Sequence, residues 1–162
     1  SPSGTGSPPS DMSTLLSIVS LPFSDCHCHY ALDEIGAIDR LIASADSIGY
    51  VGCRDVETYI TKVNPEASFT HYEIPPQASF GELHDEPHFP FYFGKTQEAL
   101  SVPNSKNLFL VAAGVLGKIY CDTIKKRGGV AIDIGAIADA WSGRYDTRPF
   151  IERNYSPLGH KK

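Results

Sequence analysis

With 162 residues, 41% of them apolar and 20% charged, the chain has the size and composition of one soluble globular domain. Its net charge of -5 and pI near 5.6 argue against a nucleic-acid-binding protein, which normally carries a basic face. No apolar run approaches the ~20 residues of a membrane-spanning helix, and residues 15–23 lack the basic flank of a signal peptide. We therefore expect a cytoplasmic protein, a setting in which Cys53 and Cys121 stay reduced.

The segment before the first predicted strand combines a tail, a loop and two helices. Residues 1–10 contain only Ser, Pro, Gly and one Thr, so they are predicted to form a disordered tail. Asp11 is a candidate cap for a short helix that ends before Pro22. Residues 25–30 are predicted to form a polar loop. Apolar residues then recur at helical spacing across 32–45, which predicts one amphipathic helix.

From residue 48 onward, short apolar runs alternate with helical patterns. Strands are predicted at 48–53, 68–74, 108–113 and 130–134, and helices at 55–63, 91–100, 119–127 and 136–141. This alternation is typical of a parallel sheet with right-handed crossovers. The predicted fold class is therefore α/β, a Rossmann-like parallel sheet of about four strands flanked by helices. We expect a single domain over 11–150, with polar residues from 143 onward leading into an irregular C-terminal tail over 151–162.

A glycine turn between the third predicted strand and its helix has the chemistry of an anion site. Gly114 permits a positive φ, Gly117 permits close packing of helix on strand, and the helix N-terminus with Lys118 attracts negative charge. If the first two strands lie on one side and the last two on the other, a crevice falls between the first and third strands. The residues predicted to bind a nucleotide or its phosphates are Arg54, Gly114, Gly117, Lys118, Asp133 and Gly135. The alternative is that both glycines only permit a tight turn.

The stretch FLVAAGVLGKIYCDTIKKRGGVAIDIG at 109–135, continuing to DAWSG at 139–143, resembles the GT-D-type glycosyltransferase-like fold family. Looser similarity runs back through 51–55, 72–75 and 88–90, so that the resemblance spans most of residues 30–150. It implies a bacterial enzyme of cell-surface polysaccharide or glycoprotein assembly. Such an enzyme transfers a sugar from a nucleotide-sugar donor to a hydroxyl group of a glycan acceptor.

The resemblance also implies a divalent metal, Mn²⁺ or Mg²⁺, held by a D-x-E motif that follows an early strand. In this sequence Asp55-Val56-Glu57 is the matching motif, so Asp55 and Glu57 are the candidate metal ligands. The alternative is that the family's motif lies upstream of Ser1, in a portion that this sequence does not contain. The metal and Lys118 would stabilise the leaving diphosphate. Asp55 and Asp133 are the candidate catalytic carboxylates; with Glu73 they are the carboxylates predicted at strand ends, and the choice of base among the three stays open.

Two other functions stay open at this point. The first is an NAD(P)-binding domain in which Asp133 accepts hydrogen bonds from a ribose hydroxyl. The second is a non-catalytic α/β domain that serves a partner, a neighbouring catalytic domain or a second copy of the chain. The run Cys26-His27-Cys28-His29, together with His84 and His88, has metal-binding residue types, but a polar surface loop is the preferred interpretation. Trp141 is expected to pack at the sheet edge rather than to stack on a ligand.

Overall fold

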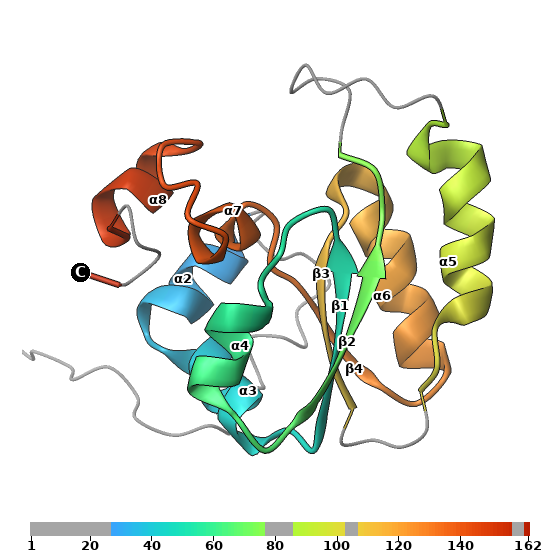
Figure 1. The fold of residues 1–162 in the computed structure, drawn as a ribbon, viewed down its shortest axis with the longest axis horizontal. Helices are drawn as coiled ribbons and strands as arrows, with labels where there is room; N and C mark the ends of the chain where they lie inside the picture. Colours follow the sequence, from blue (N-terminus) through green and yellow to red (C-terminus); the bar gives the residue numbers. More distant parts are fainter. Residues whose placement is uncertain (1–26, 77–85, 103–106, 157–160) are drawn as a thin grey trace, which may run out of the picture.

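The computed structural model describes residues 27–76, 86–102, 107–156 and 161–162, and its centre is a four-stranded parallel sheet (Figure 1). The strands are β1 (Ser47–Gly52), β2 (Ser68–Glu73), β3 (Asn107–Ala112) and β4 (Val130–Asp133), in the spatial order β2-β1-β3-β4. Ser47 of β1 pairs with Ser68 on one side and with Asn107 on the other. The predicted α/β Rossmann-like fold is confirmed, and the first two strands lie on one side of the sheet and the last two on the other.

Alternate residues of the central strands supply two separate hydrophobic clusters. In β3, Leu108 and Leu110 join the cluster on one face, and Phe109 and Val111 join the cluster on the other face. Both faces of β1 and β3 are covered because these strands lie in the middle of the sheet, and this explains why each is apolar after its first residue. Gly49 of β1 leaves room for the ring of Phe109 on the neighbouring strand.

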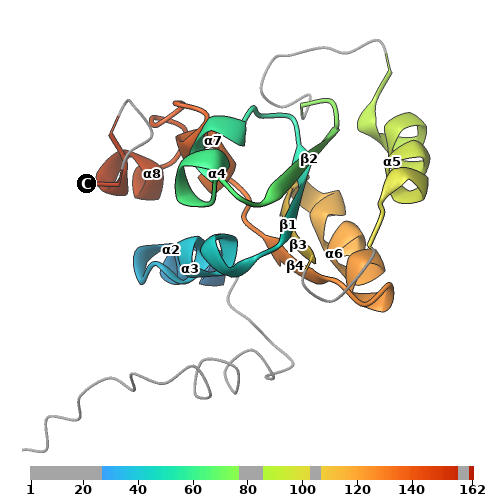
Figure 2. The same ribbon diagram turned by 60° about the horizontal axis from the view of Figure 1, so that its bottom comes forward.

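Helices cover both faces of the sheet (Figures 1 and 2). One face carries α5 (Phe93–Ala99) and α6 (Gly117–Lys126). The other carries α2 (Cys28–Glu34), α3 (Ala37–Ser44), α4 (Glu57–Val63), α7 (Ile137–Trp141) and α8 (Pro149–Asn154). None of the helices in the described ranges is long and apolar enough to cross a membrane.

The structure corrects three details of the predicted elements. The helix predicted over 32–45 is two helices, because Gly36 adopts a φ of 69° between them, and α2 starts inside the predicted polar loop. The helix predicted over 91–100 is preceded by a kinked turn, η2 (His88–Tyr92), in which Phe89 has a φ of -108° and a ψ of 132°. The predicted disordered tail and the predicted helix after Asp11 lie outside the described residues.

The C-terminal segment, predicted to be irregular over 151–162, instead contains most of α8 and joins the core. Pro149 stands at the start of this helix, where its fixed φ suits the first turn. Ile151 and Tyr155 are both fully buried in the cluster beneath α2, α3 and α4. Burial of these two side chains orders a stretch whose overall composition is polar.

A polar network ties the C-terminal segment to α2 and α3. The Tyr155 hydroxyl donates to Asp33 Oδ2 at 2.7 Å, and the Lys161 ammonium lies 2.9 Å from Asp33 Oδ1. Lys161 also donates to Asp39 Oδ2 at 3.1 Å, and the Tyr59 hydroxyl donates to Asp39 Oδ1 at 2.9 Å. Asp33 is 1% exposed, so these partners replace the water that its carboxylate loses on folding.

Candidate ligand-binding crevice

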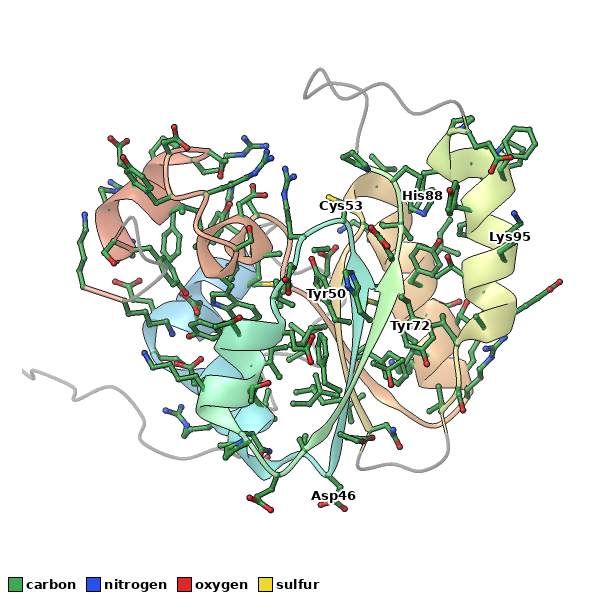
Figure 3. All side chains as sticks on the ribbon, in the orientation of Figure 1. Asp46, Tyr50, Cys53, Tyr72, His88 and Lys95 are labelled. Carbon is green, nitrogen blue, oxygen red and sulfur yellow. The ribbon has the colours of Figure 1, made fainter. Side chains whose placement is uncertain are left out.

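The strand order reverses between β1 and β3, and a cavity of about 150 Å³ lies at this point. After β1 the chain passes to α4 on one face, whereas after β3 it passes to α6 on the other face. The two connections diverge and leave a crevice outside the carboxyl ends of the strands. Figure 3 shows Cys53 and His88 at this end of the sheet and Asp46 at the opposite end.

Charged side chains and glycine backbone line the cavity together. Arg54 comes from the connection after β1, Gly114 from the turn after β3, and Gly135 from the turn after β4. Asp139 of α7 and Arg148, the residue before α8, complete this polar part of the wall. Arg54 and Arg148 are 94 positions apart in the sequence, so only the tertiary fold brings them to one cavity.

The Arg54–Asp139 ion pair is the best-defined charged contact of the crevice. The Arg54 Nε donates to Asp139 Oδ1 at 2.9 Å, and the two side chains are 10% and 13% exposed. Asp139 therefore holds the Arg54 side chain at the carboxyl end of β1. A largely buried guanidinium with a fixed orientation is suited to hydrogen-bond a phosphate oxygen.

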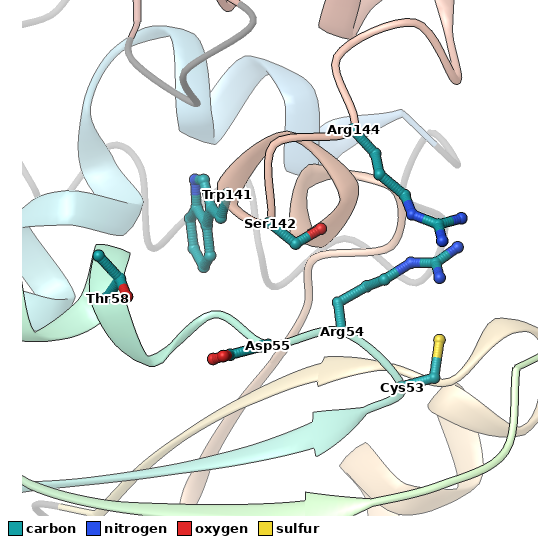
Figure 4. Close-up of a pocket in the computed structure, with 7 residues that line it drawn as sticks. All are labelled: Cys53, Arg54, Asp55, Thr58, Trp141, Ser142 and Arg144. Atoms are coloured by element: carbon teal, nitrogen blue, oxygen red, sulfur yellow. The ribbon is translucent and has the colours of Figure 1, made fainter.

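A second, more open groove of about 400 Å³ shares Cys53 and Arg54 with the cavity (Figure 4). Its other walls are Asp55, Thr58, Trp141, Ser142 and Arg144. Figure 4 shows the Arg54 and Arg144 side chains directed toward the same end of this groove. The shared residues make the cavity and the groove two adjoining parts of one crevice.

Two of the predicted glycines line the cavity, in conformations that side chains rarely adopt. Gly114 has a φ of 56° at the start of the 3₁₀ turn η3 (Gly114–Leu116), and Gly135 has a φ of 47° after β4. The backbone can therefore come close to a ligand at both positions. Both glycines line the cavity, and binding of a phosphate there stays a prediction.

Gly117 and Lys118 lie elsewhere. Gly117 is buried, and a Cβ atom added there would stand 3.1 Å from Asp133 Oδ2 and 3.5 Å from Val111 Cγ1. Gly117 thus allows α6 to pack against the end of β4, as the alternative interpretation of the turn proposed. Lys118 is exposed on the first turn of α6, and neither the cavity nor the groove is lined by it.

Asp133 is a half-buried carboxylate that packs inside the fold. Its Oδ1 accepts the backbone N–H of Gly135 at 3.1 Å, and its Oδ2 faces Gly117. Burial raises the pKa of Asp133, and the Gly135 N–H, Lys118 and His29 oppose this rise. These contacts assign Asp133 a role in holding the turn after β4, and its predicted role as base or ribose ligand has no contact in support.

The two acidic residues of the D-x-E motif lie in different surroundings. Asp55 borders the groove, and its Oδ1 accepts the backbone N–H of Glu57 at 3.1 Å, at the start of α4. Glu57 and Glu73 are exposed and line neither hollow. Across the described ranges, no three His, Cys, Asp or Glu side chains are placed to bind one metal ion. The residues described here do not fit a protein-held divalent metal.

The remaining sequence candidates have packing roles or belong to other contacts. The Trp141 ring stacks on Tyr59, with centroids 4.5 Å apart and planes at 9°, which agrees with the expected packing role. Within the His27–His29 run, His29 contacts the Tyr30 ring at 4.1 Å. Cys26 and His84 lie outside the described residues. The sequence reasoning missed Arg144 and Arg148, because they fall in a polar stretch without a periodic pattern or a motif.

Comparison of the chain with protein-family models, with curated proteins and with solved structures finds no match in any of the three.

Proposed function

We propose that the crevice between β1 and β3 binds the diphosphate of a nucleotide sugar, and that the chain is the donor-binding domain of a glycosyltransferase. One observation carries the proposal: two arginines and two glycines with positive φ line a single cavity where the strand order reverses. The choice of a sugar donor rests on the resemblance of residues 109–143 to the GT-D-type family.

The charge of the cavity wall favours an anion. Arg54 and Arg148 contribute two positive charges, and Asp139 offsets one of them. A phosphate oxygen would meet guanidinium N–H groups that cannot lose their proton at neutral pH. Charge-assisted hydrogen bonds of this kind are stronger than those between neutral groups, and more so in a partly buried site.

The two hollows differ in the part of a ligand that they suit. A cavity of about 150 Å³ is small beside the roughly 300–1,000 Å³ of common small-molecule sites, so it suits phosphate groups rather than a whole nucleotide. The groove of about 400 Å³ that adjoins it at Arg54 has room for the rest of the molecule. Its polar side chains can hydrogen-bond the hydroxyl groups of a sugar; they are Thr58, Ser142 and Asp55.

Calorimetric titration with pyrophosphate, UDP and NAD⁺, with and without Mn²⁺, tests the proposal. We expect pyrophosphate and UDP to bind, and Arg148→Gln to weaken both by about tenfold, because one charge-assisted hydrogen bond is lost. Arg148 is exposed, so its removal should leave the fold intact. Lys126→Gln is the matched control, because Lys126 is 75% exposed at the far end of α6, where it pairs with Asp122.

Other binding patterns would contradict the proposal. Binding of NAD⁺ without UDP or pyrophosphate would favour the dinucleotide-binding alternative. No binding of any of the three would favour a non-catalytic domain. If Arg148→Gln and Lys126→Gln weakened binding equally, the loss would reflect net charge alone, and the crevice would not be the binding site.

A further inference from the structure

His88 brings a histidine to the same cavity from a part of the chain unrelated to the glycine turn. It is the first residue of η2, it is half-buried, and it lines the cavity together with Arg54 and Gly114. Figure 3 shows it at the carboxyl end of the sheet, between the strands and α5. His88 is therefore a polar group of the cavity wall that is separate from the Arg54–Asp139 pair and from the glycine backbone.

Tyr120 holds the His88 ring in one orientation. His88 Nε2 and the Tyr120 hydroxyl oxygen are 2.8 Å apart, and the two rings stack with centroids 5.7 Å apart and planes at 12°. Tyr120 lies on α6 and is fully buried. Because Tyr120 engages His88 Nε2, Nδ1 is the ring nitrogen available for a ligand.

The hydrogen bond between Tyr120 and His88 decides where the proton of this pair lies. Tyr120 is fully buried, and its hydroxyl oxygen lies 2.8 Å from His88 Nε2, so this nitrogen is the acceptor that the hydroxyl proton has beside it. An imidazole nitrogen is a stronger base than a phenol oxygen, so the Tyr120 O–H donates and His88 Nε2 accepts. Burial also lowers the pKa of His88, so its ring is neutral at pH 7 and carries its proton on Nδ1.

We propose that His88 is a ligand-contacting residue whose Nδ1–H donates a hydrogen bond to a phosphate oxygen of the ligand in the cavity. This rests on the proposed function, because the cavity must first hold an anion. The Tyr120–His88 pair presents a donor without a full charge, whereas Arg54 and Arg148 present charged donors. His88 would therefore fix the orientation of the phosphate more than it adds charge.

Two substitutions of His88 separate its two nitrogens. The amide nitrogen of Asn falls close to the place of Nδ1, and that of Gln falls close to the place of Nε2. We expect His88→Asn to bind pyrophosphate within about threefold of the wild type, and His88→Gln to bind it about tenfold more weakly. Circular dichroism and thermal melting of both variants show whether each is folded before calorimetry.

A second measurement uses the unaltered protein. Long-range ¹H–¹⁵N correlation spectra of the His88 ring report which nitrogen is protonated. We expect a protonated Nδ1 in the free chain, and we expect this nitrogen to shift most when pyrophosphate is added. A proton on Nε2, or an Nδ1 signal that pyrophosphate leaves unchanged, would overturn the role of His88 even if both variants failed to fold.

The outcomes keep the two proposals apart. Pyrophosphate binding that Arg148→Gln weakens and His88→Gln leaves intact would overturn the role of His88 alone. A wild-type chain that does not bind pyrophosphate would overturn the anion site, and the role of His88 with it.

Discussion

Removal of the Tyr155 hydroxyl should cost the protein a measurable part of its stability. In Tyr155→Phe, Asp33 Oδ2 loses the hydroxyl that donates to it at 2.7 Å, while Lys161 stays 2.9 Å from Oδ1. Asp33 is 1% exposed, so water has little access to replace the lost bond. A hydrogen bond to a charged group contributes about 1.5–3 kcal/mol, and we expect a loss of about 2 kcal/mol in the free energy of unfolding.

Urea denaturation followed by tryptophan fluorescence is the assay for this change. Trp141 is the single tryptophan, and its indole N–H lies 3.3 Å from the Tyr155 hydroxyl, so its emission reports this region. A loss of 2 kcal/mol corresponds to a fall in Tm of about 4–8 °C for a chain of this size. Tyr145→Phe is the matched control: Tyr145 is 36% exposed, and its variant should stay within about 0.5 kcal/mol of the wild type.

Equal stability of the two variants would refute the reasoning. It would mean that Lys161 alone satisfies the Asp33 carboxylate, and that the Tyr155 hydroxyl contributes nothing beyond the burial of its ring.

Three further predictions concern the glycines, the half-buried carboxylate and the buried ion pair. Gly49→Ala should destabilise the chain by about 1–3 kcal/mol, because the new methyl group meets the Phe109 ring, whereas Gly94→Ala, with open space around it in α5, should stabilise the chain by about 0.5–1 kcal/mol. Urea denaturation in which the two variants change the free energy of unfolding in the same direction would contradict this. Asp133→Asn should raise stability at pH 7, because the raised pKa of Asp133 means that the folded state resists ionisation of this carboxyl. The advantage should fall away as the pH drops from the raised folded-state pKa to below the ordinary aspartate pKa of 3.8, and a difference independent of pH between 3 and 7 would contradict it. Asp139→Asn should lower the free energy of unfolding by about 3 kcal/mol, because it leaves the largely buried Arg54 guanidinium beside a neutral amide. The double variant with Arg54→Gln should lose less than the sum of the two single variants, and strictly additive losses would show that the pair is not coupled.

The regular elements around the sheet were predictable because their signals are local. The strand pattern of β3 and the glycines at both ends of α6 depend on hydrophobic periodicity and on backbone conformations that neighbouring residues determine. The strand order entered only as a condition, although right-handed crossovers leave few topologies. The same reasoning failed at Gly36, whose positive φ ends one helix and starts the next, and at α8, a helix that depends on burial against distant residues.

The composition of the crevice is a property of the tertiary structure. The sequence marked Arg54, Gly114 and Gly135 because each follows a predicted strand, and the carboxyl ends of parallel strands share one edge. It gave no sign that Arg148 and His88 face the same cavity, because they come from irregular connections whose direction depends on how α5 and α8 pack. Nor could it show that Gly117 faces the Asp133 carboxylate. Both residues were predicted to bind a nucleotide, and in the structure they pack against each other. Hydrophobic periodicity predicts where a residue lies along a helix or strand. Contacts between side chains from separate connections depend on how the helices pack against the sheet, which only the tertiary structure shows.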